Sequence, residues 1–331
     1  MNDKARLESL ADDILLTIRS RPGRVRTISS LVERFGVSED DLSRALLYIT
    51  QWGYRLKHGR NGVTYLDAPD LLTATEIGYQ LKTKYLGRTI YAYNSVHSTN
   101  DIAARLAVEG APEGTLVTSE IQTKGRGRLS RSWHSPPETG IYASIILRPG
   151  FASEQAPGLS IMTALALADT IEAYCPDQTK IKWPNDVLIS GRKVAGILTE
   201  LAAEGRRIEH VVIGVGINVN HQAEDFPSEL RPTATSLRRA TRRKQSRVEL
   251  LQKFLVRLEK EYNGYKKRGL RTSRTRLRWY SSLMGHQVKL ALGRRIIEGR
   301  VLDFDLDGSL ILQTEQARVT LCSGEVTVVK E

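Results

Sequence analysis

Cysteine is scarce in this chain of 331 residues, and long apolar runs are missing. Two cysteines, Cys175 and Cys322, are too few for a disulfide framework or a cysteine-based metal site, and they fit a reducing cytoplasm. The six histidines are scattered, without a pair at metal-ligand spacing. No apolar stretch reaches the ~18 residues that a membrane helix needs, and the first residues lack a signal-peptide core. We therefore expect a cytoplasmic protein with no membrane partner and no protein-bound metal.

Acidic residues are also scarce in one region, which explains the net charge of +12. Residues 231–279 hold 17 Lys and Arg against three Glu, and the rest of the chain holds 32 basic and 34 acidic residues. The overall charge is therefore no evidence that the N-terminal region binds nucleic acid. The basic segment has two interpretations, a solvated face or a surface for an acidic partner. Apolar residues from 248 to 265 predict one amphipathic helix within it.

The first 68 residues have the pattern of a winged helix-turn-helix domain. Apolar spacing predicts a helix over 7–18, a second over 28–35, and a third that follows Ser38 as its N-cap and runs to about residue 51. Residues 52–66 then alternate around an Asn-Gly turn, as a β-hairpin does. Two short helices with a glycine turn and a hairpin are typical of this DNA-binding fold.

DNA binding by this domain is a separate question with two answers. The candidate contact residues lie on the third helix and the hairpin: Ser38, Ser43, Arg44, Lys57 and Arg60. Three carboxylates, Glu39, Asp40 and Asp41, stand at the helix end that would approach the groove, although acidic residues there are also ordinary dipole partners. We favour DNA binding over a winged helix kept for packing or partner contact.

Three further segments follow this domain. Residues 69–80 are expected to form a linker, and residues 81–282 mix helices and strands in an α+β domain around a largely antiparallel sheet. Residues 283–331 contain several short strands and an Asp-Gly turn, and they predict a small β-barrel.

The run from Gln122 to Trp133 places arginines among glycines in a way that suits anion binding. It is neither a P-loop nor a dinucleotide fingerprint, because Ser130 stands where the third glycine would be. Guanidinium groups bind carboxylate and phosphate through two hydrogen bonds at once, so Arg126, Arg128 and Arg131 together suit a substrate that offers both groups. Taken alone, the loop also fits RNA binding or a solvated basic turn.

Further motifs narrow these possibilities. Lys182–Asp186 reads KWPND, Lys193–Glu200 reads KVAGILTE, and Gly214–Asn220 reads GVGINVN; Ser98-Thr99-Asn100 lies upstream. This ordered set resembles the biotin protein ligases over residues 85–331, and the bifunctional ligase/repressor type more weakly to the N-terminus. The resemblance implies a class-II-synthetase-like α+β catalytic domain and an SH3-like C-terminal barrel. It also implies the formation of biotinyl-5′-AMP from biotin and ATP with Mg²⁺, and transfer of biotin to a lysine of a biotin carboxyl carrier domain.

Formation of an acyl-adenylate requires positively charged side chains at the active site. A carboxylate must be activated before an amine can attack it, and an acyl-adenylate supplies that activation through a transition state rich in negative charge. By resemblance, Lys182, Arg126 and Arg128 are catalytic. The residues implied to bind biotin or nucleotide are Ser98, Thr99, Asn100, Gln122, Arg126, Gly127, Arg128, Arg131, Lys182, Asn185, Lys193, Gly196 and Asn218.

Two positions depart from the family pattern. Ser130 replaces a common glycine, and His97 stands where an acidic residue is frequent. Neither removes a group that the chemistry needs. The alternatives are a lipoate or octanoate ligase, and a biotin-sensing DNA-binding regulator without ligase activity. The coexistence of both domains further predicts a homodimer that presents two winged helices to operator DNA.

Overall fold

The computed structural model describes residues 3–293 and 295–329. The chain divides into two compact units, Met1–Asp70 and Leu71–Glu331, and each is described by itself. Among the described residues, no helix is both long and apolar enough to cross a membrane.

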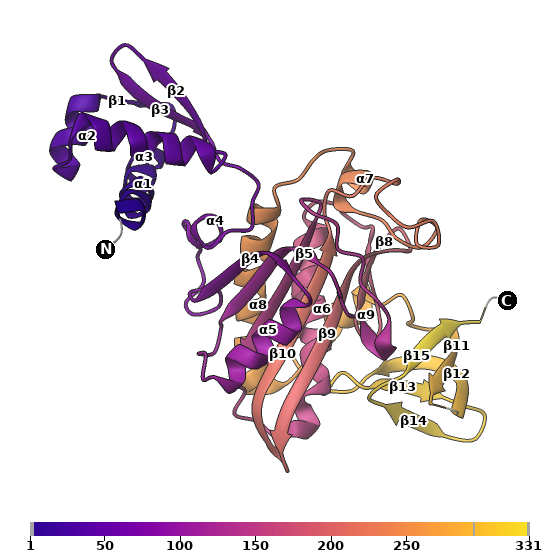
Figure 1. The fold of residues 1–331 in the computed structure, drawn as a ribbon. Coiled ribbons are helices and arrows are strands. Elements are labelled where there is room, and N and C mark those ends of the chain that lie inside the picture. The colour runs from indigo at the N-terminus through magenta and orange to yellow at the C-terminus, as the bar shows by residue number, and fades with distance from the viewer. Residues whose placement is uncertain (1–2, 294, 330–331) are drawn as a thin grey trace. The chain divides into compact units, whose positions relative to one another are not determined.

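The first unit packs three helices and a small sheet around one core (Figure 1). The helices are α1 (Asp3–Arg19), α2 (Ile28–Phe35) and α3 (Glu39–Gln51). The Ser38 side chain caps α3 by accepting a hydrogen bond from the Asp41 amide at 3.1 Å. Strands β2 (Arg55–Gly59) and β3 (Gly62–Asp67) form the expected hairpin, and β1 (Val25–Arg26) adds a third strand beside β3. The predicted order of helices and hairpin is confirmed.

The second unit is built on a seven-stranded sheet of order β4-β5-β6-β10-β9-β8-β7. Only β4 and β5 are parallel, and the other pairs are antiparallel. The strands are β4 (Ile90–Val96), β5 (Leu116–Gln122), β6 (Gly140–Leu147), β7 (Thr179–Lys182), β8 (Asp186–Ile189), β9 (Arg192–Glu204) and β10 (Arg207–Asn218). The mixed, largely antiparallel sheet expected for this region is confirmed.

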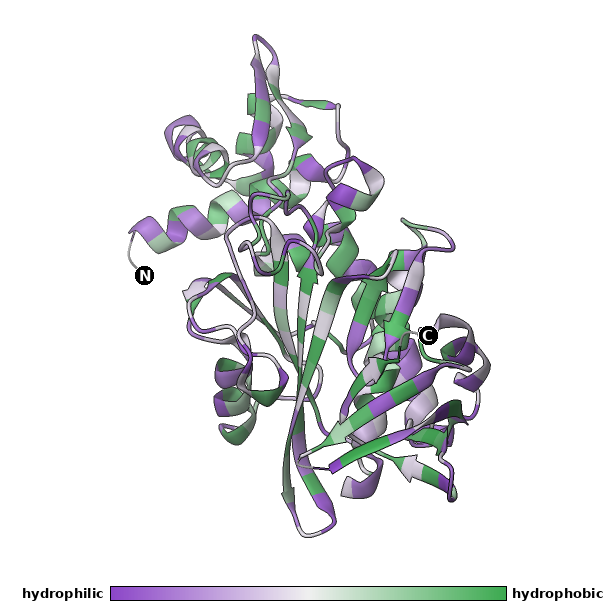
Figure 2. Ribbon diagram, turned by 90° about the vertical axis from the view of Figure 1, so that its right-hand side faces the viewer, coloured by the Kyte–Doolittle hydropathy of each residue, from purple (hydrophilic) through white to green (hydrophobic). Residues whose placement is uncertain are grey.

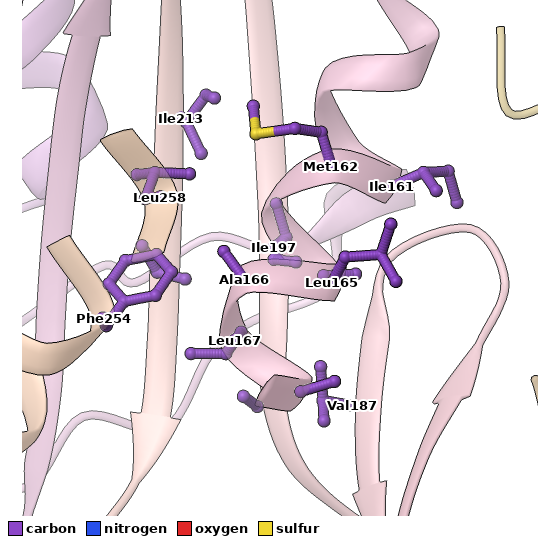
Figure 3. Close-up of a cluster of buried hydrophobic side chains, with 14 of the residues drawn as sticks. Ile161, Met162, Leu165, Ala166, Leu167, Val187, Ile197, Ile213, Phe254 and Leu258 are labelled. Atoms are coloured by element: carbon purple, nitrogen blue, oxygen red, sulfur yellow. The ribbon is translucent and has the colours of Figure 1, made fainter. Parts of the chain in front are cut away.

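Helices cover both faces of this sheet. Helix α5 (Thr99–Val108) packs on one face against β5, β6 and β10. Helix α6 (Pro157–Glu172) lies on the other face against β7, β8 and β9, and α8 (Arg247–Arg268) packs beside it on the same face, against β6 (Figure 1). Figure 3 shows Met162 and Ala166 of α6 among Ile197, Ile213 and Phe254. Because α6 is enclosed on both sides, it is apolar around most of its circumference, whereas the exposed tip of the β9–β10 hairpin is hydrophilic (Figure 2).

The C-terminal region is all antiparallel, with strand order β14-β13-β12-β11-β15. Its strands are β11 (Gln287–Leu292), β12 (Arg295–Phe304), β13 (Leu310–Gln313), β14 (Arg318–Leu321) and β15 (Glu325–Val328). Its buried residues belong to the same hydrophobic core as the central sheet. The indole N–H of Trp183 donates to the carbonyl of Gly308 at 2.9 Å, so the KWPND segment is directly attached to this region.

Two segments differ from the expectation. Residues 69–80 contain the short helix α4 (Ala74–Gly78), because Leu72, Ile77 and Leu81 are buried in the second unit. The basic segment 231–279 contains the predicted amphipathic helix as α8, and it also holds two short helices that were not predicted, α7 (Leu237–Thr241) and α9 (Arg274–Tyr280). Both additional helices are short and rich in arginine, and an apolar pattern could not reveal them.

Part of the basic charge is neutralised inside the fold. The buried Arg247 side chain lies 2.6 Å from Glu120, and Arg276 bonds to both Asp169 and Glu261. Arg274 and Arg278 share Asp303, and their hydrogen bonds lower the pKa of that carboxyl to about 2. Arg247, Arg274 and Arg276 are therefore not fully solvated, whereas Arg278 is exposed although it is paired with Asp303.

Candidate active site

Two adjacent cavities lie at one end of the central sheet, within the second unit. The larger, of about 430 Å³, is bounded by the arginine-containing loop Gln122–Trp133, the KWPND segment, residues 226–234 and the start of β15. The smaller, of about 50 Å³, is bounded by the start of α5 and by strands β5, β9 and β10. The walls shared by both are Gly127, Arg128, Trp133, Asn185 and Lys193. A ligand that spans both cavities must therefore pass these five residues.

The small cavity has a neutral polar end. Ser98 is the N-cap residue of α5, and its hydroxyl makes no hydrogen bond to the helix end. The amide and hydroxyl of Thr99 both donate to Oε1 of Gln122, at 2.9 and 3.1 Å, and Nε2 of Gln122 donates to Ser135 at 3.1 Å. These bonds fix the Gln122 amide. The arrangement suits an uncharged ligand group that both donates and accepts hydrogen bonds.

Trp133 forms the partition between the cavities and lies on strands β9 and β10. A Cβ atom on Gly196 would come within 2.9 Å of the indole, and one on Gly216 within 2.3 Å. Glycine at these positions therefore lets the ring lie flat on the sheet. Nε1 of Trp133 is buried and has no hydrogen-bond partner among the described residues. Lys193 Nζ lies 5.3 Å from the ring centroid, within cation–π range.

The three loop arginines have different surroundings. Arg126 is paired with Asp101 and Glu200, at 2.6 and 2.8 Å; although burial alone would lower its pKa, its bonds to these carboxylates raise it. Arg128 donates to Oδ1 of Asn185 at 3.0 Å, and burial lowers its pKa against the opposing effect of nearby carboxylates. Because Arg128 is the most buried of the three, it is the cation for which a ligand anion would matter most.

Residues of the C-terminal region contact the arginines of this loop. Arg131 forms an ion pair with Glu325 of β15, and Arg128 also approaches the carbonyl of Gly324 at 3.4 Å. Gly324, Glu325 and Val326 line the larger cavity. The site is therefore built from both ends of the second unit.

The KWPND segment supplies further polar groups. Lys182 ends β7 with an exposed side chain on the larger cavity. Nδ2 of Asn185 donates to the Ile197 carbonyl at 3.0 Å, which directs its Oδ1 toward Arg128. Asp186 lies 2.7 Å from Lys193 Nζ. A cation, a fixed amide and a paired lysine thus surround the passage between the cavities.

The loop backbone is strained at two neighbouring residues. Leu129 and Ser130 have φ angles of 54° and 58°, in the left-handed region. This conformation explains why glycine would be favoured at position 130. The Ser130 side chain is exposed, so serine is tolerated without a steric clash at the price of backbone strain.

Comparisons with known proteins agree with this geometry. The Biotin/lipoate A/B protein ligase family matches residues 92–218, and the Biotin protein ligase C terminal domain matches residues 283–329. The bifunctional ligase/repressor BirA of Bacillus spizizenii is 39% identical over 267 residues, which cover 81% of this chain and 82% of the relative.

The chain belongs to the biotin protein ligase family.

Two other members are similar over less of the chain. The biotin–[acetyl-CoA-carboxylase] ligase of Mycobacterium tuberculosis is 34% identical and covers 69% of this chain and 85% of its own. The solved biotin protein ligase from Aquifex aeolicus, in complex with biotin and ATP, has a TM-score of 0.64 at 29% identity and covers 74% of this chain and all of its own.

The sequence motifs of this family member meet at one place. All the predicted ligand residues line at least one cavity: Ser98, Thr99, Asn100, Gln122, Arg126 and Gly196 the smaller, Arg131, Lys182 and Asn218 the larger, and Gly127, Arg128, Asn185 and Lys193 both. Asn100 is buried and fully bonded, since its Oδ1 accepts from Ser144 at 2.6 Å and its Nδ2 donates to Glu200 at 2.7 Å. Both ends of its amide are therefore held by the protein at the wall of the smaller cavity.

Sequence reasoning missed several residues of the site. Phe226, Leu230 and Thr233 line the larger cavity from the long connection after β10, and Glu325 comes from the last strand. None of these lies in a recognisable motif. Of these residues, Glu325 lies within residues 283–329, which match the Biotin protein ligase C terminal domain.

The predicted DNA-contact residues all belong to the first unit, and their side chains differ in exposure and in the bonds they already make within the protein. Ser43, Lys57 and Arg60 are exposed. Arg44 is held by Asp3 at 2.9 Å, and Ser38 is occupied as the cap of α3. Three of the five side chains are therefore directly available to a partner.

Proposed function

We propose that the protein forms biotinyl-5′-AMP from biotin and ATP and then transfers the biotinyl group to a lysine of a carboxylase carrier domain. The observation that supports this most is the meeting of a neutral polar cavity and a larger basic cavity at Arg128, Asn185 and Lys193. We assign the chemistry to residues 81–282, completed by residues of 283–331, with 69–80 joining this part to the domain of residues 1–68.

The ligand placement follows from the polarity of the two cavities. The ureido ring of biotin is neutral and both donates and accepts hydrogen bonds, which suits Ser98, Thr99 and Gln122. The carboxylate then lies toward Arg128 and Lys193, at the passage to the larger cavity. ATP occupies the larger cavity, where the apolar wall around Phe226 suits the base.

Adenylate formation is an in-line displacement at phosphorus. A carboxylate oxygen of biotin attacks the α-phosphorus of ATP, an oxygen–phosphorus bond forms, and the bond to pyrophosphate breaks. Arg128 and Lys193 stabilise the charge at the attacking side, and Lys182 stabilises it on the phosphates. Arg126 and Arg131 belong to the loop over the product, where exclusion of water protects the anhydride from hydrolysis.

Magnesium fits this site as a companion of the nucleotide. Within the described residues, no cluster of three or more His, Cys, Asp or Glu could hold a metal ion. Mg²⁺ commonly binds through one or two carboxylates together with substrate phosphates. Asp186, on the wall of the larger cavity, is suited to that role. When bound, the ion would offset the charge of the triphosphate.

Transfer needs an amine and a leaving group. The acceptor lysine attacks the acyl carbon of the adenylate, an amide bond forms, and AMP leaves with the anhydride electron pair. The amine loses one proton to solvent or to the departing phosphate.

The test uses purified protein with radiolabelled ATP, Mg²⁺ and biotin. We expect an adenylate that depends on biotin and that disappears when a biotin carrier domain is added, with the label then released as AMP. Adenylate without transfer would favour a biotin-sensing regulator, and competition by lipoate would favour a lipoate-type ligase. Absence of any adenylate from folded protein would contradict the proposal.

We also propose a biotin-responsive repressor function. Two observations support it: the helices and hairpin of the first unit, and the similarity to a bifunctional ligase/repressor over most of the chain. In this proposal the adenylate-bound protein dimerises and presents two winged helices to operator DNA, with Ser43, Lys57 and Arg60 as contacts. Sedimentation that does not change on addition of biotin and ATP would contradict the dimer, and binding to its own promoter DNA tests the contacts.

A further inference from the structure

A basic cluster on the second unit is not neutralised by acidic side chains of the described residues and has no part in the proposed chemistry. It consists of Arg238, Arg239, Arg242, Arg243 and Lys244, on and after α7. The last three are exposed, and none of the five forms an ion pair within the described residues. This distinguishes them from Arg247, Arg274, Arg276 and Arg278 of the same segment, which are paired.

The backbone that carries this basic cluster is firmly held. Ser236 caps α7 by accepting from the Arg239 amide at 3.1 Å, and its hydroxyl donates to the His221 carbonyl at 2.6 Å. Asn220 and Gln245 exchange two hydrogen bonds of 2.9 Å across the base of the connection. The backbone of this segment is thus fixed by hydrogen bonds, while the charged side chains of the basic cluster have no acidic partner among the described residues. Like charges held together in this way repel one another, so an acidic partner that binds them relieves that repulsion.

The basic cluster adjoins the wall of the larger cavity. The Lys193 amide donates to the Thr233 carbonyl at 2.8 Å, and the Thr235 amide donates to the Lys193 carbonyl at 2.9 Å. Thr233 and Ala234 line the cavity, and the Arg239 guanidinium donates to the Ala234 carbonyl and lies 6.0 Å from the ring centroid of Phe226. One continuous segment thus contributes residues 226–234 to the cavity wall and then carries the basic cluster, in which Arg239 contacts that wall.

We propose that this basic cluster docks an acidic surface of the acceptor protein beside the acceptor lysine. The proposal rests on the proposed function, because the acceptor must bring its lysine to the acyl carbon in the cavities and so must cover part of their rim. The chain outside residues 231–279 has slightly more acidic than basic residues, so the cluster is a local positive site on a nearly neutral background. Such a rim charge chiefly raises the association rate.

The position of the basic cluster favours a protein over nucleic acid. A partner of the ligation site has to approach this rim in every catalytic cycle, whereas the predicted DNA contacts lie in the other unit. A bound duplex at the rim would also occupy the approach of the acceptor. We therefore assign the cluster to the acceptor, and nucleic-acid binding becomes a contrary outcome of the test.

The test compares two charge-reversal variants of the full chain. The first is Arg242→Glu/Arg243→Glu/Lys244→Glu, which leaves Arg239 and its contact with Phe226 intact. The matched control is Lys267→Glu/Arg268→Glu/Arg271→Glu, which changes the charge equally at exposed positions near the C-terminal end of α8. Pyrophosphate release with hydroxylamine as the trapping nucleophile reports adenylate formation without an acceptor. Transfer to a biotin carrier domain, and its binding affinity, report docking.

We expect both variants to form adenylate at the wild-type rate. In the first variant alone, kcat/KM for the carrier falls by about tenfold or more at low salt, mainly through KM, and its dependence on salt weakens. The direct affinity for the carrier falls in parallel, a readout that does not require ligase activity. Equal effects in the two variants, or an unchanged KM and affinity in the first, would overturn the proposal. So would unchanged carrier binding combined with lost binding to a random DNA duplex.

Discussion

Replacing Gly216 with alanine tests whether Trp133 is the partition between the two cavities. The new Cβ atom would lie 2.3 Å from Cε2, 2.5 Å from Nε1 and 2.7 Å from Cζ2 of the indole. Because ordinary carbon contacts begin near ~3.5 Å, the ring or the strand must move by about 1 Å. Gly216 lines the smaller cavity and Trp133 lines both, so this shift changes the space for both ligands.

The expected loss of stability follows from overpacking, and the expected loss of activity follows from displacement of the reacting groups. Forcing an extra methyl group into a tight contact costs about 1–3 kcal/mol of stability. A misplacement of about 1 Å near reacting groups can lower kcat/KM by about 100-fold. Urea denaturation should therefore show a moderately destabilised second unit, while biotin titration calorimetry and pyrophosphate release should show much larger losses.

Two further variants make this test decisive. Gly264→Ala is the matched control, because Gly264 lies in α8 and a Cβ atom added there would meet no described atom within 4 Å other than those of its chain neighbours and its own helix backbone. It should stabilise the protein by about 0.5–1 kcal/mol and leave activity unchanged. Combining Gly216→Ala with Trp133→Phe should recover part of the loss, since the smaller ring leaves room. Wild-type biotin affinity in Gly216→Ala, or strictly additive effects in the double variant, would contradict the role of Trp133 as a partition.

Three other changes probe the loop, the catalytic cation and a buried histidine. Ser130→Gly should keep adenylate formation at or above the wild-type rate, whereas Ser130→Val should slow it, because a β-branched residue is strained at the positive φ of position 130. Equal rates of pyrophosphate release from the two variants would contradict this argument from backbone strain. Lys182→Gln should lower kcat for adenylation by about 100-fold, with little change in the urea midpoint because the side chain is exposed; a large loss of stability would instead indicate a structural lysine. Burial lowers the pKa of His221 from 6.5 to about 4. Between pH 6.5 and pH 4 the unfolded chain therefore binds more protons than the folded protein does, and the free energy of unfolding falls by about 3 kcal/mol as the pH drops across this range. His221→Gln should lack this pH dependence in denaturation titrations, and a slope like that of the wild type would show that His221 is not its source.

The local elements and the family could be predicted from the sequence alone. Periodic apolar residues specified α2, α3 and α8 closely, because each of these helices buries one apolar face in the core. The loop Gln122–Trp133, KWPND and KVAGILTE could be recognised as one set through their resemblance to the biotin protein ligases, and the arginines of the loop suit a carboxylate and a phosphate. Ser38 was identifiable as a helix cap because capping is decided within four residues.

Which of these elements and motifs contact one another was decided only by the tertiary structure. Strand β7 has four residues and α9 has seven, too few for a periodic pattern, and each forms only where the sheet or α6 offers a surface. Trp133 became a partition through contact with glycines on two other strands, and Glu325 entered the site from the far end of the chain. The basic segment shows the same limit: its sequence specified the charge, but the fold determined which arginines are paired inside and which remain at the rim of the cavity. Pairing between distant residues depends on chain closure and packing, and no local pattern contains that information.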